Sequence, residues 1–440
     1  MDLADMAMVA GIDNGANALA AVGFSGMLVW IVLSMGLSIR TCTQTIASRR
    51  LGQKKFPECS LALRNGQVLA ISLGVPLSIL GYFFAPQIMS LLITQEEILS
   101  FSIDYSQYAL LGIYFVLASF AFQGFYNAIE MTTVHMKVVL ISNIINVYLN
   151  AGLIYGSHNV DIFLQYYGIE KISLLWQLFY FPELGVKGAG IATFLSSLIM
   201  FLLYIIFLFK NDIRKKYRTF DFYIKTTLLK KQAKLAFPLA TQEFLSSIGF
   251  FLFFKILDLI GTVELATTNV IFRIAHASFM PAIGIGQAAS TLVGKYIGER
   301  KEHKLNDLIF QTIYLSLIIM GSMGIIFIFF PSKIISLFNV PNEIYLLGIP
   351  SLRLIGVLQF FDAIGISLWF IVMGAGDVKF SAITDCSIIW FVFVPTSYLL
   401  GITYNWGYWG PWIGFSLHII LFALIISYRI WSGKWRGIEV

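Results

Sequence analysis

Two aspartates lie inside stretches of this sequence that are otherwise almost wholly apolar. Asp5 is in the segment at the amino end, and Asp362 is near the middle of the run 346–372. Placing a charged aspartate at the centre of a membrane-spanning helix costs roughly 2.5–3.5 kcal/mol, so such a residue normally faces a cavity or a partner. Burial makes a carboxyl easier to protonate, and its oxygens also suit a small cation. Both residues are therefore candidate carriers of H⁺ or Na⁺, and the sequence leaves both ions open.

A structural role is the alternative for each aspartate. Asp362 could form a salt bridge with Arg353 on its own expected helix or with Arg273 on another. The amino-terminal half offers Asp5 little basic partner apart from Arg40. The functional interpretation is therefore the stronger of the two for Asp5.

Sequence patterns for enzymatic chemistry are absent. Gly294-Lys295 is followed by Tyr296, so the phosphate loop of an ATP-driven pump is not formed. There is no His-Glu-x-x-His or Cys-x-x-Cys pattern, the five histidines are isolated, and the three cysteines are scattered. We expect a protein that is not an enzyme and that holds no metal or organic cofactor beyond a coupling ion.

The composition is that of a membrane protein. Of the 440 residues, 58% are hydrophobic and only 12% are charged, with a mean hydropathy of +0.79, whereas soluble domains carry roughly 25% charged residues. A membrane-spanning helix needs about 20 apolar residues. The pattern predicts helices near 17–40, 66–92, 103–129, 134–156, 187–209, 235–260, 264–293, 309–331, 346–372, 378–402 and 409–429, with a fragment at 1–11.

Most of the positive charge is expected on one side of the membrane and does not form a single surface patch. If the expected helices alternate in direction, most lysines and arginines fall on one side, in the loop 49–64, the linker 210–234 and the tail 429–436. The positive-inside rule makes this side, and with it the carboxyl terminus, cytoplasmic. The net charge of +6 therefore indicates topology in a plasma (inner) membrane and no binding of nucleic acid.

Short matches recur at one fixed distance along the chain. Thr45 returns as Thr291 and Gly52 as Gly298, and each pair is separated by 246 residues. Internal repeats of this size in a hydrophobic chain are typical of two-lobed transporters with a pathway between the lobes. The polar segment 212–230 is expected to be a partly helical cytoplasmic linker between an amino-terminal lobe, 1–211, and a carboxy-terminal lobe, 231–440.

The repeat also predicts that the first helix is truncated. The counterpart of Pro238, near the start of the second lobe's first helix, would lie before Met1. With that helix completed, we expect an all-α polytopic membrane protein of twelve helices, six in each lobe. A chain that truly has eleven helices and a short re-entrant start is the alternative.

Several motifs then resemble the multidrug and toxin extrusion (MATE) family of secondary transporters. In the first lobe these are Asp5-Met-Ala-Met-Val, Ala18-Leu-Ala-Ala-Val, Asn146-Val-Tyr-Leu-Asn150 and the glycine-rich start of the sixth helix at 185–193. The second lobe adds Pro238, Gly284-Ile-Gly286, Gln359-Phe-Phe-Asp362 and Gly374-Ala-Gly376-Asp377. Each motif is weak alone, whereas their order, spacing and topology together are specific and cover nearly the whole chain.

The resemblance implies two groups of site residues for the coupling ion and the substrate. The first lobe of such proteins holds a polar cluster that matches Asp5, Asn146, Asn150 and Thr193. Many relatives have an aspartate at the position of Asn150, so this chain lacks one carboxylate of the pair. In the second lobe, a tenth-helix aspartate matches Asp362. The seventh-helix glutamate position is Ser246 here, and Glu243, three residues earlier, is a possible substitute.

The resemblance implies a cation-gradient-driven antiporter that exports amphipathic organic cations or drug-like molecules by alternating access. We expect a monomer in the lipid bilayer with a small-molecule substrate. A flippase for lipid-linked oligosaccharides or peptidoglycan precursors, from the same superfamily, is the alternative, although the chain has few arginines to hold a pyrophosphate. The long aromatic loop 157–184 is expected to lie along the outer membrane surface or to cover the exit as a lid.

Overall fold

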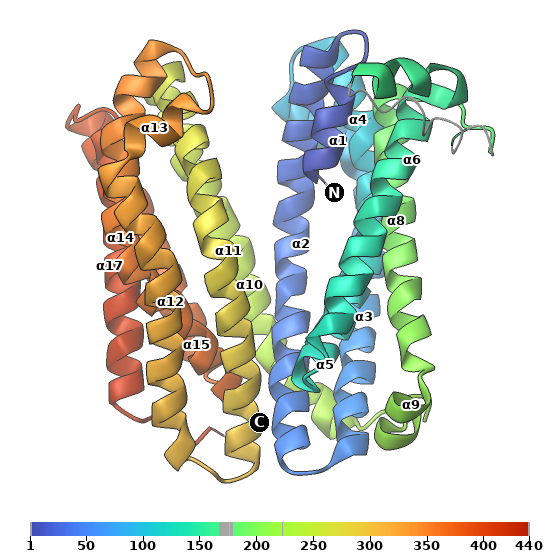
Figure 1. Cartoon of the computed structure of the whole chain (residues 1–440), viewed down its shortest axis with the longest axis vertical. Coiled ribbons are helices and arrows are strands. Elements are labelled where there is room, and N and C mark those ends of the chain that lie inside the picture. Colours follow the sequence, from blue (N-terminus) through green and yellow to red (C-terminus); the bar gives the residue numbers. More distant parts are fainter. Residues whose placement is uncertain (1, 167–175, 177–178, 222, 439–440) are drawn as a thin grey trace. The chain divides into compact units, whose positions relative to one another are not determined.

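The computed structural model describes residues 2–166, 176, 179–221 and 223–438, and within these ranges the regular structure is entirely helical (Figure 1). The chain divides into two compact units. Unit 1 comprises Met1–Thr43, Ser60–Tyr126 and Glu130–Thr226, and unit 2 comprises Gln44–Cys59, Asn127–Ile129 and Thr227–Val440. Most of the first half therefore clusters separately from the second half, but two short segments of the first half pack with the second.

The helices of the first half run from blue to green in Figure 1. They are α1 (Asp2–Val9), α2 (Gly15–Gly52), α3 (Phe56–Leu92), α4 (Glu96–Leu111), α5 (Ile113–Ala128), α6 (Thr132–Tyr166), α8 (Gly185–Leu208) and the short α9 (Asn211–Tyr217). The segment expected to be a partly helical linker thus contains α9 and the first turn of α10.

The helices of the second half run from yellow to red. They are α10 (Thr226–Ile260), α11 (Thr262–Gly298), α12 (His303–Phe329), α13 (Pro331–Ser336), α14 (Asn342–Ala375), α15 (Val378–Ile388), α16 (Val394–Tyr398) and α17 (Trp409–Trp431), with π-helical turns η2 (Ile389–Phe393) and η3 (Leu399–Thr403) on either side of α16. Each apolar stretch expected to span the membrane is helical.

Eight helices or continuous helical stretches in the described part of the chain are long and apolar enough to cross a bilayer, and the pair α4–α5 makes a ninth if it forms one span. Helices α10 and α11 are just as long, at 35 and 37 residues, but they do not pass the same test of apolarity. These two helices carry more polar residues within their membrane-length segments, and α10 contributes two of them, Gln242 and Ser246, to a buried cluster described below.

The prediction of one continuous helix over 103–129 is wrong, because the structure has two helices there. Helix α4 ends at Leu111, α5 begins at Ile113, and the two are bent by 43°. The residue between them is Gly112, which lies beside the backbone of α8: an added Cβ would lie 3.4 Å from Phe194 Cα, an ordinary van der Waals distance. The break therefore falls at a single residue packed beside α8 and not at a polar loop.

Small residues let the helices of unit 1 approach closely. A Cβ on Gly188 of α8 would lie 2.1 Å from the Leu153 carbonyl oxygen of α6, and one on Gly190 would lie 2.8 Å from the Tyr105 carbonyl oxygen of α4. Neither distance can accommodate a side chain. Glycines at these two positions bring α4, α6 and α8 together at the level where their polar side chains meet.

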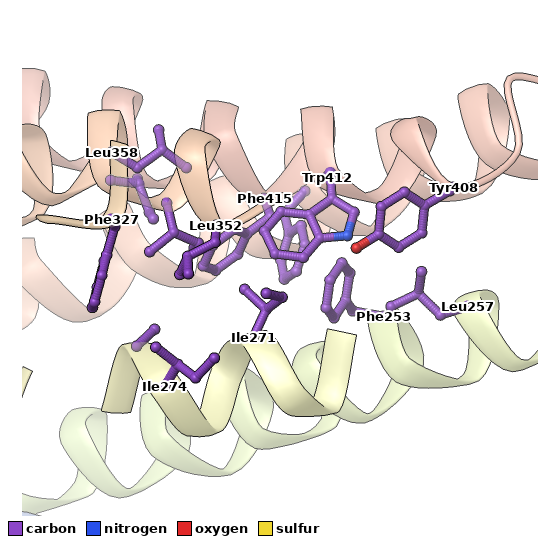
Figure 2. Packing of buried hydrophobic residues seen from close by; sticks show 14 of the residues in the cluster. Phe253, Leu257, Ile271, Ile274, Phe327, Leu352, Leu358, Tyr408, Trp412 and Phe415 are labelled. Carbon is purple, nitrogen blue, oxygen red and sulfur yellow. The ribbon is translucent and has the colours of Figure 1, made fainter. Parts of the chain in front are cut away.

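Unit 2 is packed around a large aromatic and aliphatic core. Phe253 of α10, Ile271 of α11, and Trp412 and Phe415 of α17 are buried together (Figure 2). The π-helical turn η2 contributes Phe393 to the same core. This turn ends one residue before α16, where Pro395 lacks the backbone N–H that an α-helix would use.

Two matching hydrogen bonds in unit 2, one from α2 to α14 and one from α11 to α5, are made by residues that the sequence repeat relates. The Thr45 hydroxyl donates to the Met373 carbonyl oxygen at 3.0 Å, and the Thr291 hydroxyl donates to the Asn127 carbonyl oxygen at 3.3 Å. Both the two threonines and the two acceptors are separated by the repeat distance in the sequence. The repeat therefore corresponds to an internal symmetry of these hydrogen bonds.

Glycines of the two repeats follow the same rule at the ends of α2 and α11. A Cβ on Gly52 would lie 2.1 Å from the Lys295 carbonyl oxygen, and one on Gly298 would lie 2.3 Å from the Arg49 carbonyl oxygen. Gly52 and Gly298 are counterparts in the repeat, and so are the residues they contact, Lys295 and Arg49. Only residues without a side chain permit this approach.

The middle of the aromatic loop expected over 157–184, residues 167–175, 177 and 178, lies outside the described residues. In the part that is described, α6 passes through Gly156 at a positive φ of 74°. Trp176 donates from its indole nitrogen to the Tyr148 carbonyl oxygen at 2.7 Å, and Phe181 packs edge-on against the Tyr148 ring. The surface and lid roles both stay predictions.

Candidate functional site

Asp5 lies at the centre of a buried polar cluster in unit 1. Its side chain is fully buried. The Asn150 amide donates to Asp5 Oδ1 at 2.6 Å, and the Thr193 hydroxyl donates to Asp5 Oδ2 at 2.6 Å. Short hydrogen bonds of this kind are typical of an ionised acceptor. The site therefore stabilises a carboxylate where no bulk water is available to do so.

Asn146 joins the same cluster one helical turn before Asn150. Its side-chain oxygen accepts a 3.4 Å hydrogen bond from the Asn150 amide nitrogen. The structure thus brings together Asp5, Asn146, Asn150 and Thr193. Their role in ion coupling stays a prediction.

Tyr105 is a further member that sequence reasoning missed. Its hydroxyl donates to Asp5 Oδ2 at 2.8 Å, and the residue is buried in α4. No motif distinguishes Tyr105 from its neighbour Tyr108. Only the close packing of α4 on α8, which Gly190 permits, brings this hydroxyl to Asp5.

Two buried amide atoms beside Asp5 have no hydrogen-bond partner among the described residues. They are Asn146 Nδ2 and Asn150 Oδ1. A buried polar atom without a partner costs about 1–3 kcal/mol. A bound water could accept from Asn146 Nδ2, and a water or a small cation could bind Asn150 Oδ1 beside the carboxylate, so the cluster fits an ion site as well as a purely structural network.

The second group of expected residues belongs to unit 2. Glu243 of α10 and Asp362 of α14 are both partly exposed within this unit. Among the residues that the structure describes, no ion pair joins Asp362 to Arg353 or Arg273. The structural alternative for Asp362 is therefore not realised in this conformation, and a functional role for either acid stays a prediction.

Unit 2 also has a carboxylate in a buried polar cluster, and the sequence motifs did not predict it. Asp385 of α15 accepts hydrogen bonds on Oδ2 from the Gln242 amide at 3.0 Å and from the Ser246 hydroxyl at 2.8 Å. A ring nitrogen of His418 on α17, Nε2, lies 3.0 Å from Asp385 Oδ1. Ser246, which takes the place of the glutamate that the resemblance implied, thus contributes to a carboxylate on another helix.

The sequence did contain a signal for this cluster. Asp385 is an acid within the apolar run 378–402, and His418 is a titratable residue within the run 409–429. The argument that singled out Asp362 applies equally to Asp385. Treating the five histidines as isolated along the chain hid the pair, because 33 residues separate its members.

Comparison with known proteins places this arrangement in a family. A sequence model described as MatE matches residues 1–151 and 238–399. The chain belongs to the MatE family. The two matched MatE segments contain Asp5, Asn146 and Asn150 in the first half, and Glu243, Asp362 and Asp385 in the second.

Individual MatE relatives match over almost the whole chain. The chain is similar to the "Probable multidrug resistance protein NorM" of Thermotoga maritima, with 29% identity over 96% of this chain and 86% of the relative. It is also similar to the "Probable multidrug resistance protein YoeA" of Bacillus subtilis, with 24% identity over 97% and 88%.

Solved structures support the same MatE fold. A structure described as "Crystal structure of MATE in the bent conformation" superposes with a TM-score of 0.83 at 21% identity, covering 98% of this chain and 91% of the other. The eukaryotic MATE transporter AtDTX14 gives a TM-score of 0.81 at 16% identity, covering 99% and 92%. The fold expected from the resemblance, that of a polytopic all-helical transporter, is confirmed.

Proposed function

We propose that this MatE protein is a cation-gradient-driven antiporter that exports amphipathic organic cations or drug-like molecules. The single observation that carries the proposal is the fully buried carboxylate of Asp5, which accepts hydrogen bonds from three other helices. A carboxylate with partners on α4, α6 and α8 links its charge state to the packing of those helices. The descriptions of the named relatives as probable multidrug resistance proteins support drug-like substrates over lipid-linked ones.

Neutralising Asp5 provides the coupling step. A proton or Na⁺ at Asp5 removes the negative charge that the Asn150 amide and the Thr193 and Tyr105 hydroxyls stabilise. Those hydrogen bonds weaken, because donors bond more strongly to an ionised acceptor. The ion drives transport only if it and the substrate favour different states, since equal affinity for both states shifts nothing.

The protein acts as a monomer in the plasma (inner) membrane with its carboxyl terminus in the cytoplasm. The basic loop 49–64 and tail 429–436 support this orientation. It needs the bilayer, a coupling ion and a small-molecule substrate, with neither nucleic acid nor an organic cofactor, and it performs no covalent chemistry.

The test is transport of a fluorescent organic cation in proteoliposomes, with either a pH gradient or a Na⁺ gradient imposed. We expect wild-type protein to move the dye under one of the two gradients and Asp5→Asn to lose that transport. Asp13→Asn is the matched control, because Asp13 is exposed in the turn after α1. Dye movement that is equal with and without both gradients, or that survives in Asp5→Asn, would overturn the coupling proposal.

A further inference from the structure

The cluster around Asp385 joins three helices of unit 2 through one carboxylate. Gln242 and Ser246 come from α10, Asp385 from α15 and His418 from α17. All three hydrogen bonds lie between 2.8 and 3.0 Å. Both carboxylate oxygens therefore lie within hydrogen-bonding distance of a polar side chain on another helix.

The histidine in this cluster has one ring nitrogen without a partner. Nε2 faces Asp385, whereas Nδ1 is buried and has no hydrogen-bond partner among the described residues. Gln242 Oε1, in the same cluster, is likewise a buried acceptor without a donor. A neutral imidazole that donates from Nε2 has an acceptor at Nδ1, and protonation turns Nδ1 into a second donor. The cluster thus holds a free proton-accepting atom and a free hydrogen-bond acceptor.

Aromatic rings surround the imidazole. Phe393 stacks on it with centroids 5.6 Å apart and planes at 20°, and Phe250 and Phe422 lie at 6.2 Å. Faces of aromatic rings attract cations, most strongly where water is excluded. The surroundings therefore favour a positively charged ring more than an aliphatic pocket would.

The other titratable groups near the ring are acidic or neutral. Asp362 of α14 is close enough to His418 for their charges to interact. Cys386 follows Asp385 on α15 and lies near Glu243 of α10. Tyr398 is the titratable residue of α16.

The nearest cation on the ring's own helix is Arg429, eleven residues further along α17, or about 16 Å. Arg429 is already paired with Asp377 at 2.6 Å. The charged groups that the structure places near His418 are thus acidic, so a protonated imidazole would lie among opposite charges.

We propose that His418 and Asp385 form a proton site in the second half of the chain, separate from Asp5. A proton from hydronium binds His418 Nδ1 and releases water, so the pair changes from a net charge of −1 to zero while Asp385 remains ionised. The new N–H requires an acceptor, which no described residue supplies in this packing. Proton uptake is thereby linked to the packing of the helices that carry the cluster. The inference rests on the proposed function for its role in transport, although the site itself can be tested without transport.

The experiment is ¹⁵N NMR of histidine-labelled full-length protein in nanodiscs between pH 5 and 8, where an unperturbed imidazole titrates at about pH 6.5. His418→Asn assigns the His418 signals among the five histidines. We expect those signals to titrate within this range. In Asp385→Asn, the midpoint should fall by about one pH unit or more, because the ionised partner is lost.

Controls separate this site from other causes. His303→Asn removes an exposed histidine at the start of α12 and should leave the His418 titration unchanged, as should Asp5→Asn. Thermal unfolding of each variant identifies any that fail to fold. Because Asp385→Asn retains His418, the effect of the pairing can be measured even if His418→Asn does not fold.

Three results would overturn the proposal. These are His418 signals that do not change with pH, a midpoint that is the same in Asp385→Asn, and a titration that Na⁺ abolishes at constant ionic strength, which would make this a sodium site. Failure of dye transport with an intact His418 titration would count against the proposed function alone. Normal gradient-driven transport with no titration would count against this inference alone.

Discussion

Asn150 decides how many carboxylates the first-half cluster contains. Its amide nitrogen is 2.6 Å from Asp5 Oδ1, so an aspartate at position 150 would bring two carboxyl groups within hydrogen-bonding distance. Two such groups cannot both be ionised without a large repulsion, and the pair retains a proton to higher pH.

We therefore expect Asn150→Asp to move the pH at which transport is half-maximal upward by about one unit or more. The measurement is dye efflux from proteoliposomes across a pH series. Asn143→Asp, two turns earlier on α6 with its amide on the Val139 carbonyl oxygen, is the control and should leave the profile in place. An unchanged profile in Asn150→Asp would show that Asp5 does not set it.

Tyr105→Phe tests the hydrogen bond that the sequence did not reveal. Losing the 2.8 Å bond to Asp5 removes a donor that stabilises the charged carboxylate, worth roughly 1.5–3 kcal/mol for a charged acceptor. We expect the pH profile to move in the same upward direction, because the protonated acid loses less than the ionised form. Tyr108→Phe, one turn on, is the control, and the readout is the same pH series. Equal profiles in the two variants would exclude a role for the Tyr105 hydroxyl.

At the residue scale, the sequence predicted those site residues that belong to motifs and missed those fixed by packing. Asp5, Asn146, Asn150 and Thr193 occur in recognisable segments, and the structure joins them. Asp385 and His418 could have been found as titratable residues in apolar runs. Their pairing depends on the approach of α15 and α17, which no local pattern specifies.

Glycines at helix crossings determine the precision of the first-half site. Gly188 lies on α8 five residues before Thr193, and its Cα faces the Leu153 carbonyl of α6 three residues after Asn150. Moving α8 from α6 at this point would separate two residues that both hold Asp5.

We expect Gly188→Ala to destabilise the protein by about 1–3 kcal/mol through overpacking and to reduce transport. Thermal unfolding in detergent and dye efflux measure the two effects. Gly284→Ala on α11 is the matched control, since an added Cβ there would have no heavy atom within 4 Å. The packing argument fails if the two variants unfold at the same temperature.

At the element scale, apolar length predicted the spans but not their interruptions. The break at Gly112 and the π-helical turns η2 and η3 fall inside continuous hydrophobic runs. Hydrophobicity reports that a segment can lie in lipid. It does not indicate where the backbone hydrogen bonds of a helix are interrupted, as they are at Gly112 and near Pro395.

The two matching hydrogen bonds, from α2 to α14 and from α11 to α5, extend the repeat from sequence into hydrogen bonding. Thr45 and Thr291 each donate to a backbone carbonyl that belongs to the other repeat. Replacing either hydroxyl by a methyl group removes one hydrogen bond to a backbone carbonyl, at a net cost of about 0.5–1.5 kcal/mol.

We expect Thr45→Val and Thr291→Val to lower stability by similar amounts, with Thr291→Val somewhat worse because Thr291 also accepts from Gln44. Thermal unfolding of both single variants and the double variant gives their coupling. Thr312→Val is the control, since Thr312 donates only within its own helix, to the Leu308 carbonyl oxygen. A large effect at one threonine and none at the other would contradict the reciprocal arrangement.

At the scale of the whole molecule, the repeat distance in the sequence predicted more than a two-lobed fold. It also relates the residues that meet in the contact of α2 with α11, although their meeting could not be deduced from the sequence. The repeat states which positions are equivalent. Whether equivalent positions touch depends on where the symmetry axis passes, and this is a property of the folded chain.

Ser48 and Gly294 are counterparts under the same repeat, and they lie against each other: a Cβ on Gly294 would be 2.0 Å from Ser48 Oγ. Two identical chains about a two-fold axis must place the same residue on both sides of such a contact. A single chain that carries both copies is free of that restriction. Such a chain can place the Ser48 hydroxyl against the backbone of Gly294. Two serines at this point would be too close, and two glycines would leave a gap. Joining the repeats in one polypeptide therefore allows packing at the axis that a pair of separate, identical halves could not achieve.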